Sequence, residues 1–298
     1  MKHHNKSKGN SGKSNSGKSN PGKGSSVAYH NRVAKRYDAI YSDDEPYWRF
    51  HDEATWRAVK NYLPRDLKSK CLDLGCGTGK WGLKLRKSGF DTTFVDHSPA
   101  MIAVVKQKLE ESEAPLAIVA DIIQMPMLAD QAFALTLAMG DPLSICTDPQ
   151  RAADEMFRTI APGGVVIATA DNRAAAMDHF INSSDLDGLE RLLRTRRTNW
   201  LTRDENEQFE TTTFTPDELR DLFRRSGFEV LRVMGKTILP VRSIRESLSD
   251  PATFRRLIDI EVELEKHDDL AARASHLQII ARRPLQTAVQ TAVQKPAT

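Results

Sequence analysis

The sequence predicts an α/β protein in which a doubly wound parallel sheet is covered by helices on both faces. Short apolar segments alternate with segments of helical periodicity, a pattern typical of parallel strands joined by right-handed crossovers. A turn with glycines at alternate positions, Gly75, Gly77 and Gly79, joins the first strand to a helix. The expected strands are 71–74, 90–95, 116–120, 133–138 and 165–170.

The glycine turn predicts a cradle for a nucleotide-like ligand. Glycine tolerates positive φ and lets a ligand approach the backbone where a Cβ would collide. The helix that follows, ending near Ser88 and Gly89, directs its free N–H groups over the turn. A strand, a bare turn and a helix N-terminus together predict a site for a nucleotide, and the kind of nucleotide stays open at this point.

Each expected strand ends at or beside an aspartate. A single aspartate at such a place is an ordinary turn residue, but ligands of doubly wound sheets lie beyond the carboxyl ends of the strands. Five acids at one edge of one sheet therefore indicate a binding site, formed by Asp73, Asp96, Asp121, Asp141 and Asp171.

The other elements follow from start and stop signals. Ser98 and Pro99 begin a helix whose buried stripe includes Met101. Further segments are expected to be helical at about 149–160, 172–213, 216–227 and 251–273, and the strands 228–233 and 276–281 to close the sheet. Before the glycine turn, helices are expected at about 28–41 and 46–62, with an aromatic cluster that either packs on the domain or forms a lid.

The composition is that of an ordinary globular protein, with 40% hydrophobic and 28% charged residues among 298. No apolar run approaches the roughly 18 residues that span a bilayer, and the N-terminus lacks the apolar core of a secretory signal. The three cysteines lack metal-type spacing. We therefore expect a reduced cytoplasmic protein without a metal site.

The basicity of the chain belongs to its N-terminal segment. Residues 1–26 contain six lysines and no acid, so the remainder carries a net negative charge although the total is +3. This Gly-, Ser-, Asn- and Lys-rich segment is expected to be a disordered, solubilising or weakly phosphate-binding tail. Its match to G-x-x-x-x-G-K-S, from Gly12 to Ser19, lacks the strand and helix that a phosphate-binding loop requires.

A dinucleotide-binding oxidoreductase is one candidate. Gly77, Gly79 and Gly82 match G-x-G-x-x-G, but the first glycine of that fingerprint should follow the strand directly, and Gly77 comes two residues late. In the register that fits the strand, Lys80 stands where glycine is needed. An NAD-dependent enzyme remains an alternative on these residues alone.

The run Leu72-Asp73-Leu74-Gly75-Cys76-Gly77-Thr78-Gly79 resembles the signature turn of class I S-adenosylmethionine-dependent methyltransferases. The resemblance covers about residues 28–284. Four later segments resemble the family in the expected order: 95–98 with Met101 following, 119–122, 139–141 and 160–164. It implies a Rossmann-like, seven-stranded sheet with an antiparallel last strand.

The resemblance also implies the residues that bind S-adenosylmethionine. Asp73 and the turn would face the methionine end, Asp96 would accept hydrogen bonds from the ribose hydroxyls, and Asp121 would accept from the adenine amino group. Met101 would pack on the adenine ring. The full expected set is Tyr37, Asp73, Gly75, Cys76, Gly77, Gly79, Asp96, His97, Met101, Asp121, Ile122, Met139 and Gly140.

Within the family, Arg36 to Tyr41 and the loop at 140–141 resemble the small-molecule branch that includes ubiquinone and menaquinone methyltransferases. Tyr37 would close over the methionine end of the cofactor. Asp141 and His51 are the candidates for orienting or deprotonating the acceptor, although a histidine in an aromatic helix more often only packs. The acceptor would be a small molecule methylated at oxygen, nitrogen or carbon.

The domain division implied is a tail at 1–26, a helical lid at 27–64, a methyltransferase domain at 65–284 with cap insertions at 172–213 and 242–273, and a flexible tail at 285–298. Three alternatives stay open: an RNA acceptor bound through the basic tail, a protein or peptide acceptor, and a non-catalytic protein that only binds the cofactor. The oligomeric state does not follow from the sequence.

Overall fold

The computed structural model of the chain describes residues 25–199 and 208–285. Almost all of the expected basic tail and of the expected C-terminal tail lies outside the described residues, and so does the G-x-x-x-x-G-K-S match. No helix among the described residues has both the length and the apolar character needed to cross a membrane.

Seven strands of the described residues form one sheet in the order β3-β2-β1-β4-β5-β9-β8. Their bounds are β1 (Lys70–Leu74), β2 (Asp91–Asp96), β3 (Ala117–Val119), β4 (Phe133–Ala138), β5 (Ile160–Asp171), β8 (Glu229–Lys236) and β9 (His276–Arg282). The first five strands run parallel, whereas β9 is antiparallel to both β5 and β8. The expected doubly wound fold with an antiparallel last strand is confirmed.

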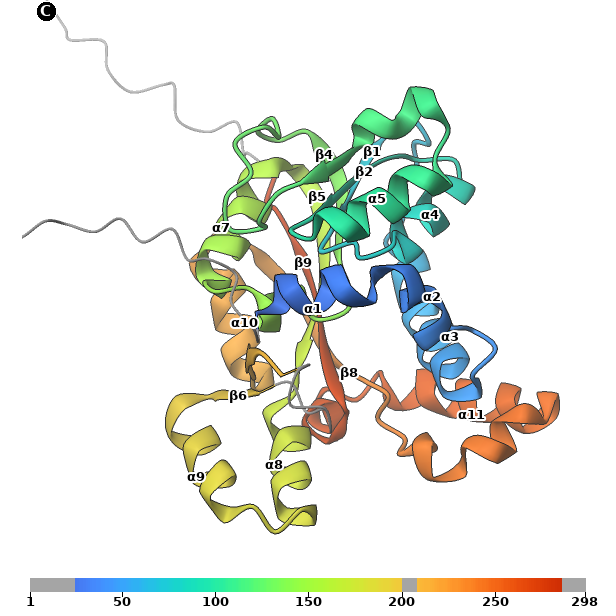
Figure 1. Cartoon of the computed structure of the whole chain (residues 1–298), viewed down its shortest axis with the longest axis vertical. Coiled ribbons are helices and arrows are strands. Elements are labelled where there is room, and N and C mark those ends of the chain that lie inside the picture. Colours follow the sequence, from blue (N-terminus) through green and yellow to red (C-terminus); the bar gives the residue numbers. More distant parts are fainter. Residues whose placement is uncertain (1–24, 200–207, 286–298) are drawn as a thin grey trace, which may run out of the picture.

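The side chains of β1 show why helices cover both faces of the sheet. Successive residues of a strand point to opposite faces. Leu72 and Leu74 are fully buried in a cluster with side chains of α7 (Pro149–Thr159) and α10 (Pro216–Arg225). Cys71 is buried on the other face, in a cluster with side chains of α3 (Pro46–Lys60) and α4 (Lys80–Lys87). Figure 1 shows these layers around the sheet.

The N-terminal segment is less regular than its periodicity indicates. The expected helix at 28–41 is divided into α1 (Ser26–Val33), a 3₁₀ turn at 34–36 and α2 (Tyr37–Ile40). The backbone of Arg36 leaves helical geometry at φ −109° and ψ 0°, which breaks the segment before Tyr37. The break lets α1 pack on α5 (Pro99–Lys108), while α2 continues toward the glycine turn.

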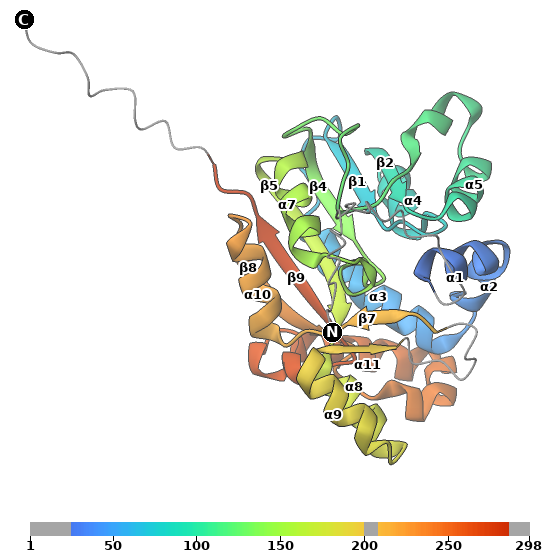
Figure 2. The ribbon, with the colours of Figure 1, turned by 60° about the vertical axis from the view of Figure 1, so that its left-hand side comes forward.

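The second half departs most from expectation. Residues 172–213 contain α8 (Arg173–Asn182) and α9 (Leu186–Thr195), but also an unpredicted hairpin of β6 (Arg197–Asn199) and β7 (Glu210–Thr212). The expected helix at 251–273 ends earlier, as α11 (Pro251–Leu264), followed by a 3₁₀ segment. Strand β5 begins at Ile160, before the Pro-Gly-Gly, because the register against β4 shifts there. Figure 2 shows α8, α9 and α11 below the sheet.

Gly82 tests the close packing of α4 on the sheet. A Cβ at this position would lie 2.3 Å from Cε1 of Phe94 and 2.7 Å from Oδ2 of Asp73. We expect Gly82→Ala to lower the free energy of unfolding by about 1–3 kcal/mol, because overpacking outweighs the helix propensity gained.

Chemical denaturation followed by circular dichroism measures this difference. Lys87→Ala, on the exposed part of the same helix, is the matched control and should change stability by less than about 0.5 kcal/mol. A Gly82→Ala protein as stable as the wild type would contradict the packing described.

Candidate functional site

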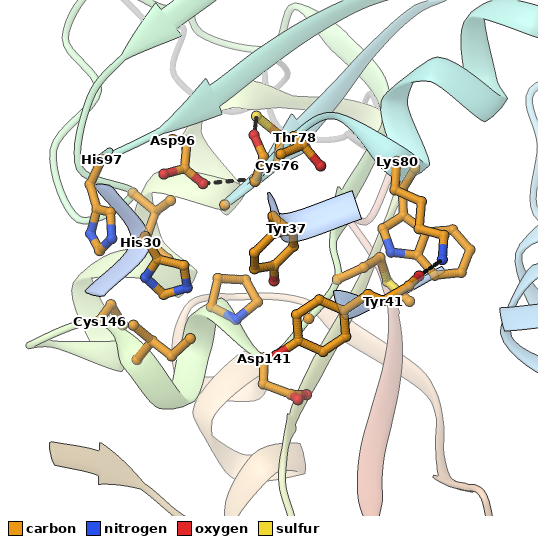
Figure 3. A pocket seen from close by; sticks show the side chains of 18 of the residues that line it. His30, Tyr37, Tyr41, Cys76, Thr78, Lys80, Asp96, His97, Asp141 and Cys146 are labelled. Atoms are coloured by element: carbon orange, nitrogen blue, oxygen red, sulfur yellow. Dashed lines mark hydrogen bonds between the residues drawn. The ribbon is translucent and has the colours of Figure 1, made fainter. Parts of the chain in front are cut away.

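A cavity opens at the carboxyl edge of the sheet, beneath the N-terminal helices. Figure 3 shows Asp96 and His97 at one end, Tyr41 and Lys80 at the other, and Tyr37 between them. The residues that line the cavity are Tyr29, His30, Tyr37, Tyr41, Trp48, His51, Asp52, Gly75, Cys76, Gly77, Thr78, Lys80, Trp81, Asp96, His97, Asp121, Ile122, Met139, Gly140, Asp141, Pro142, Ile145, Cys146, Phe209, Lys236 and His276.

The glycine turn forms one wall of this cavity with its bare backbone. Gly75, Gly77 and Gly79 have φ of 62°, 54° and 89°, which residues with a side chain rarely adopt. A Cβ on Gly75 would lie 2.6 Å from Cβ of Pro142, so the turn also packs closely against the loop after β4. The geometry and the packing both require glycine at this position.

Asp96 ties the turn to the end of β2. Its Oδ2 accepts a hydrogen bond from the N–H of Gly77 at 2.9 Å, and its Oδ1 accepts from the N–H of Ser98 at 2.8 Å. Its neighbour His97, and Asp121 and Ile122 after β3, border the same end of the cavity. The adjacent ends of β1, β2 and β3 thus bring together the residues expected to bind ribose and adenine.

Three expected cofactor residues do not line the cavity. Asp73 is fully buried beneath the turn, where its Oδ2 accepts from the N–H of Gly82 at 2.7 Å. Gly79 is the residue before α4, and Met101 is buried in a cluster with Val33 of α1. Burial, and secondarily the charge of Asp96, raises the pKa of Asp73 to about 7.

The N-terminal segment is attached to the glycine turn by polar contacts around Asp38. Its Oδ1 accepts from the hydroxyl of Thr78 at 2.5 Å, and its Oδ2 forms an ion pair with Lys108 at 2.6 Å. Lys80 donates to the carbonyl of Tyr41 at 2.9 Å. These contacts hold the ring of Tyr37 over the turn, where Cε1 would lie 3.6 Å from a Cβ on Gly77.

The loop after β4 is held by Thr169 of β5. The N–H groups of Gly140 and Asp141 donate to its hydroxyl at 3.0 and 2.9 Å. Gly140 has φ of 83°, and no atom lies within 4 Å of the position of a Cβ there. Its backbone is therefore open to the cavity beside Met139 and Asp141.

His51 lies in the cavity wall rather than only in the aromatic cluster. Its Nδ1 is 2.9 Å from Oδ1 of Asp52, which also forms an ion pair with Lys80. Burial, and then the charge of Lys236, lowers the pKa of His51 to about 3 despite Asp52. The imidazole is consequently neutral over the physiological pH range.

His276 and Lys236 are functional candidates that were not predicted from the sequence. His276 Nδ1 lies 2.9 Å from Oδ2 of Asp141 and 3.7 Å from Oδ1 of Asp171. Lys236 is 4% exposed, and it lines the same part of the cavity. Only the pairing of β9 with β5 and of β8 with β9 brings them to Asp141, so no local sequence pattern could have indicated them.

The same group is the one place among the described residues where a metal ion could be considered. Asp141, Asp171 and His276 each offer one atom, and these atoms lie within 4.8 Å of one another. Lys236 is the register partner of His276, and its buried positive charge opposes a cation there. We therefore describe the group as an acid–base cluster and assign no metal to it.

Residues 71–164 match the family model described as a methyltransferase domain. The same residues include the turn, the loop after β4 and four of the five strand-end acids, Asp73, Asp96, Asp121 and Asp141. Residues 71–164 form a methyltransferase domain. This confirms the resemblance inferred from the sequence.

The chain is also similar in sequence to proteins named as methyltransferases. The chain is 28% identical over 151 residues to a demethylmenaquinone methyltransferase of Leptospira interrogans, with 46% of the chain and 56% of that protein covered. It is 32% identical over 143 residues to one of Thermus thermophilus, covering 46% and 61%. The match thus spans little more than half of these relatives.

The fold is similar to that of solved methyltransferases. A structure of an S-adenosylmethionine-dependent methyltransferase from Methanosarcina mazei has a TM-score of 0.55 at 19% identity, covering 77% of this chain and 98% of that one. One from Thermotoga maritima has a TM-score of 0.51 at 17% identity, covering 86% and 99%.

The cofactor implied by the domain is S-adenosylmethionine, and the residues present fit it. The turn leaves its backbone bare toward the cavity, and an acid that already orders that turn stands at the end of β2. Gly140 adds a second stretch of open backbone. These features match a cofactor with a polar ribose and a charged methionine end.

Replacing Asp96 tests this end of the cavity. We expect Asp96→Ala to weaken S-adenosylhomocysteine binding by about ten- to a hundredfold, since hydrogen bonds to a charged group contribute about 1.5–3 kcal/mol each. Isothermal titration calorimetry measures the affinity. Asp91→Ala, at the exposed start of the same strand, is the matched control, and unchanged binding by Asp96→Ala would contradict the assignment.

The raised pKa of Asp73 predicts how the stability of the protein depends on pH. Its folded pKa lies above the unfolded value, so the unfolded state releases the proton first and stability falls as pH rises from about 4 to 7. The ligand-free wild type should lose on the order of 1 kcal/mol per pH unit from this group. Asp73→Asn should flatten that slope in denaturant titrations, and an equal slope in both proteins would refute the account.

Proposed function

We propose that the protein transfers the methyl group of S-adenosylmethionine to a small-molecule acceptor. The observation that carries the proposal is one cavity with a methyltransferase cradle at one end and an aromatic, acid–base wall at the other. The match to a methyltransferase domain supports S-adenosylmethionine as the cofactor. The demethylmenaquinone methyltransferases among the relatives support a small-molecule acceptor.

The residues around the turn would hold the cofactor. Asp96 would accept from the ribose hydroxyls, and Asp121, His97 and Ile122 border the region proposed for adenine. Met101, buried away from the cavity, would support this wall from behind. When bound, S-adenosylmethionine supplies a sulfonium methyl group, which is open to in-line attack by a nucleophile.

Aromatic side chains would hold the acceptor. The rings of Tyr37 and Tyr41 lie with centroids 4.6 Å apart, and those of Tyr41 and Trp48 lie 4.9 Å apart. Such a wall favours a flat, apolar molecule, because ring faces pack well on aromatic side chains. Alignment and exclusion of water by this wall would account for much of the rate enhancement.

The contacts of the N-terminal segment favour a small acceptor over a polymer. Asp38 bonds to Thr78 and pairs with Lys108, so α2 lies directly over the glycine turn. An RNA or peptide chain would have to displace these contacts to reach Asp141. A small molecule needs only a local opening of the segment.

The proposal is tested with titrations and an acceptor screen. S-adenosylhomocysteine should bind with micromolar affinity, and NAD should not bind. Radiolabelled methyl groups should pass to at least one member of a panel of small phenols, hydroquinones, amines and thiols. Tight NAD binding would indicate an oxidoreductase, and cofactor binding without transfer to the panel, RNA or peptides would indicate a non-catalytic protein.

Removal of residues 1–24 distinguishes a small acceptor from RNA. We expect turnover on a small acceptor to change by less than about twofold, because lysines strengthen binding to polyanions such as RNA and not to an uncharged small molecule. Assays at two salt concentrations measure the effect. A large, salt-sensitive loss of methyl transfer to RNA would contradict a small-molecule function.

A further inference from the structure

Three ionisable side chains stand in a row on the part of the sheet edge farthest from Asp96 and Asp121. His276, the first residue of β9, is the register partner of Asp171 on β5 and of Lys236 on β8. Residues directly paired in antiparallel strands project to the same face of a sheet. An acid, an imidazole and an ammonium group therefore lie side by side, beyond the part of the edge occupied by β1, β2 and β3.

The carboxylates hold one side of the His276 ring. The contact of Nδ1 with Asp141 is close but poorly aligned, since Nδ1 of His276 and Oδ1 of Asp141 are buried without a hydrogen-bond partner among the described residues. Burial opposes protonation of His276, but Asp141 and then Asp171 outweigh it, so its pKa lies above the ordinary histidine value. The other ring nitrogen of His276, Nε2, has no hydrogen-bond partner among the described residues.

Lys236 adds a buried cationic group that has no paired anion. None of the ion pairs among residues 25–199 and 208–285 includes it, and its Nζ lies 6.0 Å from the centroid of the Trp81 ring. Burial lowers the pKa of Lys236, although Asp141 and Asp52 oppose this effect. An ammonium group taken out of water is costly unless an anion compensates it. A ligand that becomes anionic in the cavity would provide that compensation.

We propose that His276 and Lys236 form the acceptor's deprotonation site, and that the acceptor is an aromatic hydroxyl compound of the phenol or hydroquinone type. This inference rests on the proposed methyl transfer and adds the class of acceptor. The aromatic wall of Tyr37, Tyr41 and Trp48 accommodates the ring. Lys236 stabilises the oxyanion, and His276 takes the proton.

The step balances without a further reactant. The hydroxyl proton of the acceptor passes to Nε2 of His276 while its oxygen, or a ring carbon activated by it, bonds to the methyl group. After attack by carbon, the hydrogen on that carbon leaves as a proton and the oxygen regains one, which restores the aromatic hydroxyl compound. The carbon–sulfur bond breaks and its electron pair remains on sulfur, which loses its positive charge. The imidazolium ion formed is stabilised by Asp141 and Asp171.

Groups from every packed element determine the pH dependence of this site. Asp141 faces His276 from the loop after β4, Asp171 from β5 and Lys236 from β8. His51 of α3 faces it with ring centroids 6.0 Å apart and is neutral. Since His276 must be unprotonated to act, activity should rise with pH through its raised pKa.

The proposal is tested with a chromophoric phenol, 4-nitrophenol, whose ionised form is yellow. Protein saturated with S-adenosylhomocysteine should bind it and lower its apparent pKa by about one to three units, the effect expected of a nearby cation and base. Visible absorption measured across a pH series gives this shift. Absence of binding, or binding of the neutral phenol without a shift, overturns the proposal.

Variants test whether Lys236 and His276 cause the shift in the pKa of 4-nitrophenol. Lys236→Met and His276→Gln should each reduce it, while both proteins still bind S-adenosylhomocysteine in calorimetry. His179→Gln, on the exposed part of α8, is the control and should behave like the wild type. A shift that survives both Lys236→Met and His276→Gln overturns the proposal, and so does a shift that requires added Mg²⁺ and disappears with EDTA.

Catalysis gives a separate readout. With an acceptor from the screen, His276→Gln should lower kcat by about 10²–10⁴-fold, as expected for loss of a general base, and remove the acid limb of the pH profile. Methyl transfer confined to amines or thiols would uphold the proposed function and refute this inference. Ionisation of 4-nitrophenol without any methyl transfer would uphold the site and refute the proposed function.

Discussion

The site depends on the glycine turn after β1, and the hydrogen bond from the N–H of Gly77 to the carboxylate of Asp96 holds that turn in place. It joins the turn after β1 to the end of β2 while the turn keeps its backbone bare. Two further bonds hold the same turn from other directions: Gly82 donates to Asp73 below it, and Thr78 donates to Asp38 of the covering segment. A backbone in left-handed geometry without side chains would otherwise gain conformational freedom, so these carboxylates keep it ordered for a ligand.

The order of the strands divides the sheet edge into two chemically different parts. The ends of β3, β2 and β1 carry carboxylates and glycines, which suit the hydroxyl and amino groups of a cofactor. The ends of β5, β9 and β8 carry Asp171, His276 and Lys236. Strand β4 lies between the two parts and contributes Asp141, which contacts His276. A molecule lying across β4 would therefore meet a recognition surface on one side and a proton-accepting one on the other.

The sequence was most informative where structure depends on neighbours in the chain. Apolar runs, glycines and Ser-Pro helix starts act over a few residues. The expected strand at 133–138 and the expected helix start at Pro99 therefore agree with the structure. The hairpin of β6 and β7 was missed because its strands have three residues each and little apolar pattern. The expected helix at 28–41 breaks because α1 packs on α5 while α2 follows the turn, and hydrophobic periodicity does not register such a change of direction.

The sequence by itself determined the fold class, the glycine turn and the acids at the strand ends. These features arise from local backbone geometry and from the rule that parallel strands present their carboxyl ends together. Only the tertiary structure decided that Asp73 and Met101 are buried outside the cavity, and that His276 and Lys236 line it. Their positions depend on burial and on cross-strand register between segments far apart in the chain, and neither is encoded in the residues next to them.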